Sequence, residues 1–272
     1  MLVVTGYASL DHVMYLEGPS GAERTTRGVR TAWPRAGGCP SYIAGVASQA
    51  DLKAAPLMWV GDDLLGDWFR SELQRCGVLT EGVVQISGAR SPVAMLTYDP
   101  DGACTCLYDP GAPGQEILTD SQKRLIGHAS HLCVSVGPPQ VTEDILSARA
   151  PNARLYWAMK DDAQSFTPEI CAALSASTDV IFCNRAERAM VTATSAIVVE
   201  TRGAEGVSVT IDGTETLLTV SPAKCRDMTG SGDSFAGGFI AAEMSGATPI
   251  EAAQAGIAAA NLLIAQRERT SL

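Results

Sequence analysis

The sequence predicts a three-layer α/β protein, in which a mostly parallel β-sheet carries helices on both faces, with a small β-stranded lid. Two observations support this prediction. After about residue 120, short apolar runs alternate with helical segments, which is the pattern of parallel strands joined by crossover helices. Before residue 120, two pairs of stretches with alternating polarity interrupt that pattern, and such stretches are typical of half-buried antiparallel strands.

The N-terminal third begins with an apolar strand, Met1 to Thr5, which ends at Gly6. The stretches 12–16 and 28–33 alternate in polarity and are expected to pair as antiparallel strands. The adjacent glycines Gly37 and Gly38 precede a helix of small residues expected over 41–52.

A second antiparallel pair is expected on either side of the turn Asp99-Pro100-Asp101-Gly102, because that tetrapeptide strongly favours a hairpin. Its strands are predicted over 93–98 and 104–108. The remaining elements are strands over 57–60, 131–136, 154–158, 180–183 and 196–199, and helices over 66–76 and from Gly232 and Pro249. We therefore expect a single domain over residues 1–272 with β insertions at about 11–35 and 91–109 that cover a site.

Composition excludes several classes of protein. The 272 residues are 46% hydrophobic and 18% charged, which is enough for a large core. The net charge of −10 and the lack of a dense Lys/Arg run argue against nucleic-acid binding. No apolar run reaches the roughly 18 residues of a membrane span. The N-terminus does not look like a signal peptide. The eight cysteines lack metal-site spacing, and most of them are expected to be small core residues in a cytoplasmic protein.

The run from Asp227 to Phe239 carries the strongest chemical signal. Gly230, Ser231 and Gly232 are expected at the N-terminus of a helix, where backbone N–H groups attract an anion. Asp233 in the first turn would lie beside that anion hole, where it could accept a proton from a hydroxyl during phosphoryl transfer. The simpler alternative is a glycine-rich turn with a capping aspartate.

Two other motif assignments fail. Gly232 to Ala236 has the G-x-S-x-A spacing of a nucleophile elbow, but all three histidines, which are His12, His128 and His131, precede it. Gly61 to Gly66 has the glycine spacing of a P-loop but lacks the lysine that follows in such loops.

The run from Asp227 to Phe239 resembles the C-terminal signature of the PfkB carbohydrate kinases, which belong to the ribokinase-like superfamily. Five further segments resemble motifs of the same family in the same order, so the resemblance covers most of the chain. It implies a Rossmann-like, ribokinase-like fold. The five segments are Gly6 to Asp11, Gly37-Gly38, Gly61 to Gly66, Asn184 to Glu187 and Thr201 to Gly206. Gly61 to Gly66 resembles a strand-end motif of the family.

The resemblance implies a kinase that uses ATP and Mg²⁺. Asp233 would be the catalytic base, and Gly230, Ser231 and Gly232 would form the anion hole. Glu187 would order the magnesium shell through water. The implied substrate-binding residues are Asp11, Gly37, Gly38 and Tyr42, and the implied nucleotide-binding residues are Asn184, Thr201, Gly203, Gly206 and Asn261. For Asp11 a turn aspartate, and for Asn261 an ordinary helix residue, is the alternative.

The sequence departs from the family pattern at three places. Tyr42 stands close to the position where family members often have a sugar-contacting asparagine, so it would stack on a substrate ring or fill core instead. The segment between Glu187 and the next strand is short. The final residues, from Gln266 to Leu272, do not resemble the family segment that helps to build a monovalent-cation loop, which leaves a K⁺ requirement open.

Three functions remain open from the sequence. The first is a kinase acting on a hydroxymethyl group of a sugar or sugar acid. The second is a nucleoside kinase, which aromatic residues around the lid would favour. The third is a catalytically idle nucleotide- or sugar-binding module. Exposed lid hairpins favour a homodimer formed through the lid. The aromatic residues in question are Trp33, Tyr42, Tyr98 and Tyr108.

Overall fold

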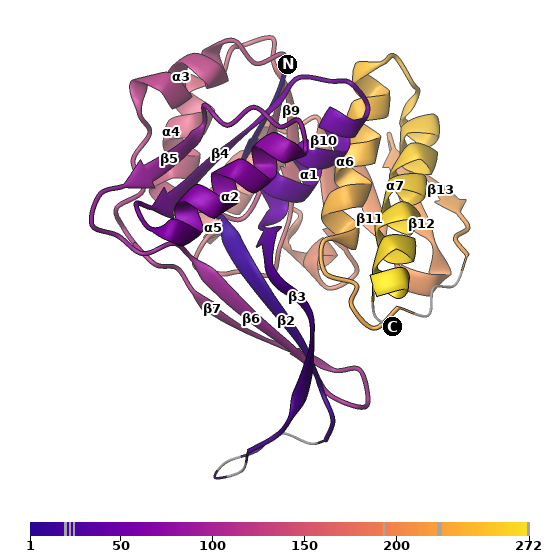
Figure 1. Cartoon of the computed structure of the whole chain (residues 1–272). Coiled ribbons are helices and arrows are strands. Elements are labelled where there is room, and N and C mark those ends of the chain that lie inside the picture. The colour runs from indigo at the N-terminus through magenta and orange to yellow at the C-terminus, as the bar shows by residue number, and fades with distance from the viewer. Residues whose placement is uncertain (19–20, 22, 24, 193, 222–224, 271–272) are drawn as a thin grey trace.

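The computed structural model describes residues 1–18, 21, 23, 25–192, 194–221 and 225–270 (Figure 1). Its core is a nine-stranded sheet formed by β1 (Leu2–Thr5), β4 (Ala54–Gly61), β5 (Val83–Ile86), β8 (His131–Val134), β9 (Arg154–Ala158), β10 (Val180–Asn184), β11 (Ile197–Thr201), β12 (Val207–Ile211) and β13 (Thr214–Leu218). The strand order is β13-β12-β11-β10-β9-β8-β1-β4-β5. Neighbours from β5 to β11 are parallel, whereas β12 and β13 are antiparallel to the strands before them. The predicted mostly parallel sheet is therefore confirmed.

Helices cover both faces of this sheet (Figure 1). One layer contains α1 (Cys39–Gln49), α2 (Leu64–Arg75), α6 (Ser231–Met244) and α7 (Pro249–Thr270). The other contains α3 (Asp120–Gly127), α4 (Pro139–Ala148) and α5 (Pro168–Ser177). Alternation along the strands explains the two layers: Leu2 and Val4 pack in the core beneath α1 and α6, whereas Val3 packs in the core beneath α3 to α5. Among the described residues, no helix combines the length and the apolar character needed to cross a bilayer.

A second, four-stranded sheet projects from one edge of the core (Figure 1). We call it the lid sheet; it consists of β2 (Ser9–Leu16), β3 (Gly28–Gly37), β6 (Val93–Tyr98) and β7 (Cys104–Asp109), in the order β3-β2-β6-β7. Both predicted antiparallel pairs are present. The sequence did not predict the parallel pairing of β2 with β6, which joins the two hairpins into one sheet. Residues 19, 20, 22 and 24 of the predicted 11–35 insertion lie outside the described residues.

Glycines bring the three helices α1, α6 and α7 into close contact. A Cβ atom on Gly237 would lie 2.9 Å from the carbonyl oxygen of Ile43 in α1. A Cβ atom on Gly238 would lie 2.8 Å from the carbonyl oxygen of Ala255 in α7. Because these two positions carry no side chain, α6 packs closely against both α1 and α7. This packing holds the N-terminus of α6 at the edge of the sheet.

The Gly238→Ala substitution should destabilise the protein. The added methyl group meets backbone of α7, which can yield only by moving a helix, and overpacking of this kind costs about 1–3 kcal/mol. The expected result is a lower free energy of unfolding in urea titrations. Gly45→Ala in α1 is the matched control, since a Cβ atom there meets nothing within 4 Å. That control should be neutral or stabilising by up to about 1 kcal/mol; equal effects of the two substitutions would contradict the packing argument.

Candidate functional site

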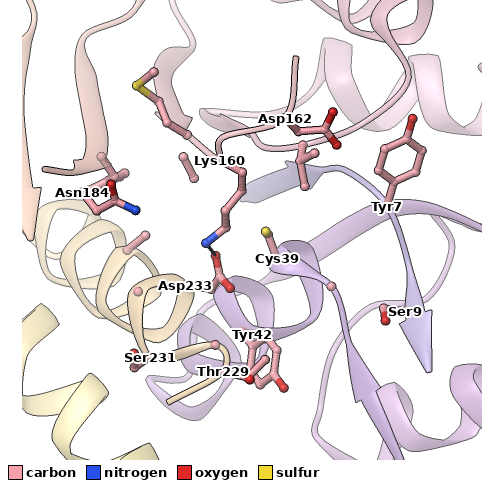
Figure 2. A pocket seen from close by; sticks show the side chains of 18 of the residues that line it. Tyr7, Ser9, Cys39, Tyr42, Lys160, Asp162, Asn184, Thr229, Ser231 and Asp233 are labelled. Carbon is pink, nitrogen blue, oxygen red and sulfur yellow. Dashed lines mark ion pairs between the residues drawn. The ribbon is translucent and has the colours of Figure 1, made fainter. Parts of the chain in front are cut away.

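A cavity of about 620 Å³ opens at the carboxyl edge of the parallel strands, between the core and the lid sheet (Figure 2). This is where ligands bind in open α/β sheets, because the loops that follow the parallel strands converge there. The structure brings residues from most of the predicted motifs to its wall. These are Asp11, Gly38, Tyr42, Asn184, Glu187, Thr201, Gly230, Ser231, Gly232 and Asp233.

The N-terminus of α6 faces this cavity. Gly230 precedes the helix with a φ of 79°, a left-handed conformation that favours glycine. A Cβ atom there would also lie 2.7 Å from the ring of Tyr42. The N–H of Ser231 donates to the carbonyl of Met228 at 3.1 Å, so this predicted anion-hole donor already has a backbone partner. The α6 terminus still directs its dipole at the cavity.

Asp233 is buried in the first turn of α6, and its carboxylate is paired with a lysine. The Nζ atom of Lys160 lies 3.1 Å from Oδ1 of Asp233 (Figure 2). Although burial alone would lower the pKa of Lys160, the carboxylate of Asp233 raises it above its usual value, so the ammonium stays charged. No predicted motif contains Lys160. The signal that could have identified it is a lysine just after a buried strand that ends at this edge of the sheet.

Asp11 reaches the cavity from strand β2. Its Oδ1 atom accepts a hydrogen bond of 2.6 Å from the Ser9 hydroxyl, and burial raises the pKa of its carboxyl group. Gly37 lies directly behind this carboxylate, because a Cβ atom there would be 2.3 Å from both carboxylate oxygens. Gly37 therefore makes room for Asp11, whereas Gly38 is the member of the glycine pair that lines the cavity.

Tyr42 connects Asp11 on the cavity wall to helix α7. Its hydroxyl donates to Oδ2 of Asp11 at 3.4 Å and accepts from Nη2 of Arg267 at 3.1 Å. The Arg267 guanidinium also lies over the ring, 5.7 Å from its centroid. Burial raises the pKa of Tyr42 to about 12, so the hydroxyl stays protonated. Tyr42 therefore lines the cavity with a polar hydroxyl as well as a ring.

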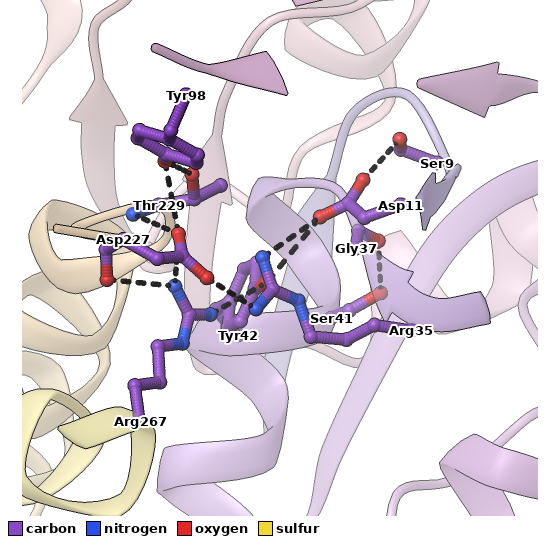
Figure 3. Close-up of polar contacts among 10 residues, drawn as sticks. All are labelled: Ser9, Asp11, Arg35, Gly37, Ser41, Tyr42, Tyr98, Asp227, Thr229 and Arg267. Carbon is purple, nitrogen blue, oxygen red and sulfur yellow. Dashed lines mark hydrogen bonds and ion pairs between the residues drawn. The ribbon is translucent and has the colours of Figure 1, made fainter. Parts of the chain in front are cut away.

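A buried group of charges lies beside Tyr42, and we call it the Asp227 cluster: Asp11, Arg35, Asp227 and Arg267 (Figure 3). The Asp227 carboxylate accepts from Nη1 of Arg35 at 2.7 Å and from Nη1 of Arg267 at 2.9 Å. Arg35 also approaches Asp11, with 3.7 Å between Nη2 and Oδ2. Burial would raise the pKa of Asp227, but the two guanidinium groups outweigh it and hold the pKa below its usual value. Neither arginine belongs to a motif that was predicted from the sequence.

On the opposite side of the cavity, Asn184 and Glu187 fix each other. The N–H of Asn184 donates to Oε2 of Glu187 at 2.8 Å, and the N–H of Glu187 donates to Oδ1 of Asn184 at 2.9 Å. Burial raises the pKa of Glu187. Glu187 thus presents a preorganised carboxylate to the cavity.

A second cavity of about 240 Å³ adjoins the first and shares Thr201, Ser231 and Gly232 with it. Its wall includes Gly203, Gly206 and Asn261, which brings all remaining predicted nucleotide-binding residues together. Gly206 has a φ of 109°, and a Cβ atom there would lie 2.1 Å from the carbonyl oxygen of Leu218, so only glycine fits. The two cavities therefore meet at the α6 terminus, where backbone N–H groups and the helix dipole favour an anion such as a phosphate.

The residues present fit a magnesium ion held mainly by a nucleotide. Within the described ranges, no group of three or more His, Cys, Asp and Glu side chains could form a protein-only metal site. Mg²⁺ usually keeps several waters and takes one or two carboxylates plus substrate phosphates. Glu187, which lines the cavity beside Asn184, is the carboxylate that could supply such a contact.

The comparisons with known proteins agree with this geometry. The family model described as pfkB family carbohydrate kinase matches residues 1–271. The chain belongs to this family. An ATP-dependent ribose-1-phosphate kinase from Halopiger xanaduensis is 26% identical over 226 residues, covering 78% of this chain and 75% of that protein.

Solved structures show the same fold. The ribokinase of Arabidopsis thaliana, in complex with ribose and ATP, has a TM-score of 0.81 and 20% identity, covering 97% of this chain and 92% of that one. The Burkholderia thailandensis nucleoside kinase, in complex with inosine, also has a TM-score of 0.81 at 20% identity, with 97% and 91% covered. The predicted ribokinase-like fold with a lid is thereby confirmed.

Asp227→Asn should strongly destabilise the PfkB protein. It leaves the buried guanidinium of Arg267 and the partly buried guanidinium of Arg35 without their shared counter-charge, and breaking buried ion pairs costs about 3–5 kcal/mol. Because the folded pKa of Asp227 is lowered, its contribution is present above the unfolded value of about 3.9 and is lost as the pH falls through the folded value. Urea titrations at several pH values should therefore show that the difference in free energy of unfolding between wild type and variant becomes smaller in acid.

The exposed pair Arg90–Asp109 supplies the control, with 75% and 50% of the two side chains exposed. Asp109→Asn should change the stability by less than about 1 kcal/mol. A loss for Asp227→Asn as small as this would show that the Asp227 cluster does not stabilise the fold.

Proposed function

We propose that this PfkB protein transfers the γ-phosphate of ATP to a hydroxyl group, in particular a hydroxymethyl group, of a sugar or sugar-like molecule. The observation that carries the proposal is the position of Asp233. Its carboxylate lies in the first turn of α6, on the wall of a cavity that contacts both Asp11 and the Asn184–Glu187 pair. One carboxylate thus lies between an acceptor side and a nucleotide side, as in-line phosphoryl transfer requires.

In the proposed reaction, Asp233 accepts the proton of the acceptor hydroxyl. The hydroxyl oxygen forms a bond to the γ-phosphorus, the bond from that phosphorus to the β–γ bridging oxygen breaks, and ADP leaves. The α6 N-terminus, at Gly230, Ser231 and Gly232, would stabilise the negative charge on the transferring group. Lys160 forms an ion pair with this carboxylate and brings a positive charge close to the reaction centre.

Asp11 is proposed to hold substrate hydroxyls, since its carboxylate oxygens are acceptors on the wall of the cavity. Gly38 and Tyr42 would complete the substrate side, with Gly37 placing Asp11. On the other side Asn184, Thr201, Gly203, Gly206 and Asn261 would contact ATP, and Glu187 would orient waters of the magnesium shell that neutralises the phosphates.

A nucleoside acceptor is the second candidate, and the aromatic wall of the cavity favours it. The rings of Tyr7 and Tyr108 both line the cavity, with 6.1 Å between their centroids. Two tilted rings at the cavity wall offer apolar surface to a base. Of the four aromatic residues that the sequence singled out, Tyr42 and Tyr108 line this cavity, whereas Tyr98 binds Asp227 and Trp33 packs against His12.

Asp233→Asn tests the proposal in an assay of ADP formation with ATP, Mg²⁺ and a panel of sugars, sugar acids and nucleosides. Because the base acts mainly in the transition state, the variant should lose at least about 10²-fold in kcat and still bind ATP. Asp144→Asn, an exposed position on α4, should retain wild-type turnover. Chelation of Mg²⁺ with EDTA should abolish turnover of the wild type.

Turnover that survives in Asp233→Asn would remove this residue from the catalytic role. A wild type that binds ATP but phosphorylates no member of the panel would favour the catalytically idle binding module instead.

We further propose that the lid sheet pairs two copies of the chain. Strand β7 is exposed along its whole length, and Leu107 and Val29 on the lid are 64% and 55% exposed. Exposed apolar edge strands are ready surfaces for a symmetric partner. Sedimentation should detect a dimer that Leu107→Asp weakens and that Leu217→Asp, on strand β13, leaves intact; a monomeric wild type would contradict the proposal.

A cytoplasmic location and the absence of nucleic-acid binding stay predictions from the sequence.

A further inference from the structure

The end of helix α7 supplies a positive charge to the loop that leads into α6 (Figure 3). The Arg267 side chain is only 8% exposed. Its Nη1 atom donates to two oxygens of a single residue, the carboxylate Oδ1 of Asp227 at 2.9 Å and the main-chain carbonyl of Asp227 at 3.4 Å. Its Nη2 atom donates to the Tyr42 hydroxyl at 3.1 Å. Three oxygens thus converge on one cation that belongs to the protein.

We propose that Arg267 is the fixed cation of this active site: it positions the loop from Asp227 to Gly230, so that phosphoryl transfer requires no added monovalent metal ion. This inference deepens the proposed function and rests on it. Arg267 is a positioning residue, because its contacts are to the loop and to Tyr42.

The hydrogen bonds of the loop explain how the arginine acts at a distance. The Oδ1 atom of Asp227 that faces Arg267 also accepts from the N–H of Thr229 at 3.1 Å, so the guanidinium and the turn share one acceptor. Gly230 follows in its left-handed conformation, and α6 begins at Ser231. The direction in which the α6 terminus points at the cavity is therefore coupled to the orientation of the Asp227 carboxylate and carbonyl.

The same contacts argue against a metal ion at these oxygens. A carboxylate, a main-chain carbonyl and a hydroxyl are the kind of ligands that alkali cations use, but here a buried guanidinium occupies the space between them. A K⁺ ion binding to the same atoms would have to displace Arg267 or lie within a few ångströms of it. Two like charges in a buried setting repel strongly, so neither arrangement competes with the existing one.

The two arginines of the Asp227 cluster contact different oxygens of Asp227. Arg35 contacts Oδ2 of Asp227 and approaches Asp11, which faces the substrate. Arg267 contacts Oδ1 and the carbonyl, which face the loop before α6. Loss of Arg267 should therefore reduce kcat more than it raises the KM of the acceptor, since the α6 terminus acts on charge that develops in the transition state.

The test compares initial rates in KCl and in tetramethylammonium chloride at equal ionic strength. The wild type should turn over at the same rate, within about twofold, in both salts. Arg267→Ala should lose at least about tenfold in kcat in tetramethylammonium chloride, the size expected when an electrostatic group in a site is misplaced. KCl should restore part of that loss, because the vacated oxygens can then bind the ion. Arg267→Lys should retain most of the activity without K⁺.

Arg269→Ala is the matched control, since Arg269 lies in the same last turn of α7 and is exposed. It should behave as the wild type in both salts. A wild-type rate that rises severalfold with K⁺ would overturn the proposal without any variant, and so would an Arg267→Ala protein with wild-type kcat in tetramethylammonium chloride.

A melting experiment separates this inference from the proposed function, because it does not depend on activity. Exchange of tetramethylammonium for K⁺ should leave the Tm of the wild type unchanged and raise the Tm of Arg267→Ala. If no acceptor is phosphorylated but these melting shifts appear, the kinase assignment fails and the assignment of Arg267 as the resident cation holds. If the wild type is stabilised by K⁺, the inference fails whatever the activity.

Discussion

The buried carboxylate of Asp227 holds the functional half of this molecule together. It accepts from Arg35 on the lid sheet, from Arg267 on α7 and from the hydroxyl of Tyr98 on β6, at distances between 2.7 and 3.0 Å. A carboxylate this deeply buried is stable only with such partners, because removing a charge from water is costly unless it is paired and hydrogen-bonded. The need to satisfy one charge thus fixes the lid strands, the last helix and the loop before α6 relative to one another.

The Asp227 cluster contains two carboxylates and two guanidinium groups, so its formal charge is zero. Neutrality matters for the proposed function, in which Asp11 offers its oxygens to the substrate, because a surplus of positive charge beside Asp11 would compete with the substrate for those oxygens. The guanidinium of Arg35 lies 3.7 Å from Oδ2 of Asp11 but 2.7 Å from Oδ2 of Asp227, so its main ion pair is with Asp227. Asp11 accordingly retains oxygen surface on the wall of the cavity.

Close helix packing provides the second constraint. Gly237 and Gly238 allow α6 to touch α1 and α7 through backbone, and the same helix starts with the turn that faces the cavity. The ion pair between Lys160 and Asp233 then joins the segment that follows strand β9 to α6. A kinase site must bring two ligands together with little tolerance for error, and a helix fixed on both sides is a suitable platform for this task.

The sequence by itself determined the features that depend on neighbouring residues. Alternating polarity located the two lid hairpins, buried apolar runs located the parallel strands, and the glycine-rich segment before Asp233 located the start of α6, since all three depend on local backbone preferences and periodicity. The order of the motifs was also sufficient to indicate the family. Most of the predicted site residues line one of the two cavities, and Gly37 lies one position behind the wall.

Only the tertiary structure decided which distant charges meet. Arg35 and Arg267 each have a partner more than a hundred residues away, and Lys160 pairs with Asp233 from a different element. No periodicity encodes the relative positions of these elements, so the roles of the three residues were not predicted. The same holds for Tyr42, whose hydroxyl joins Asp11 to Arg267 across three elements. Burial and pairing of charge are properties of the assembled sheet edge. The sequence therefore determined which chemical groups the site contains, and the fold determined which charged residues hold those groups in position.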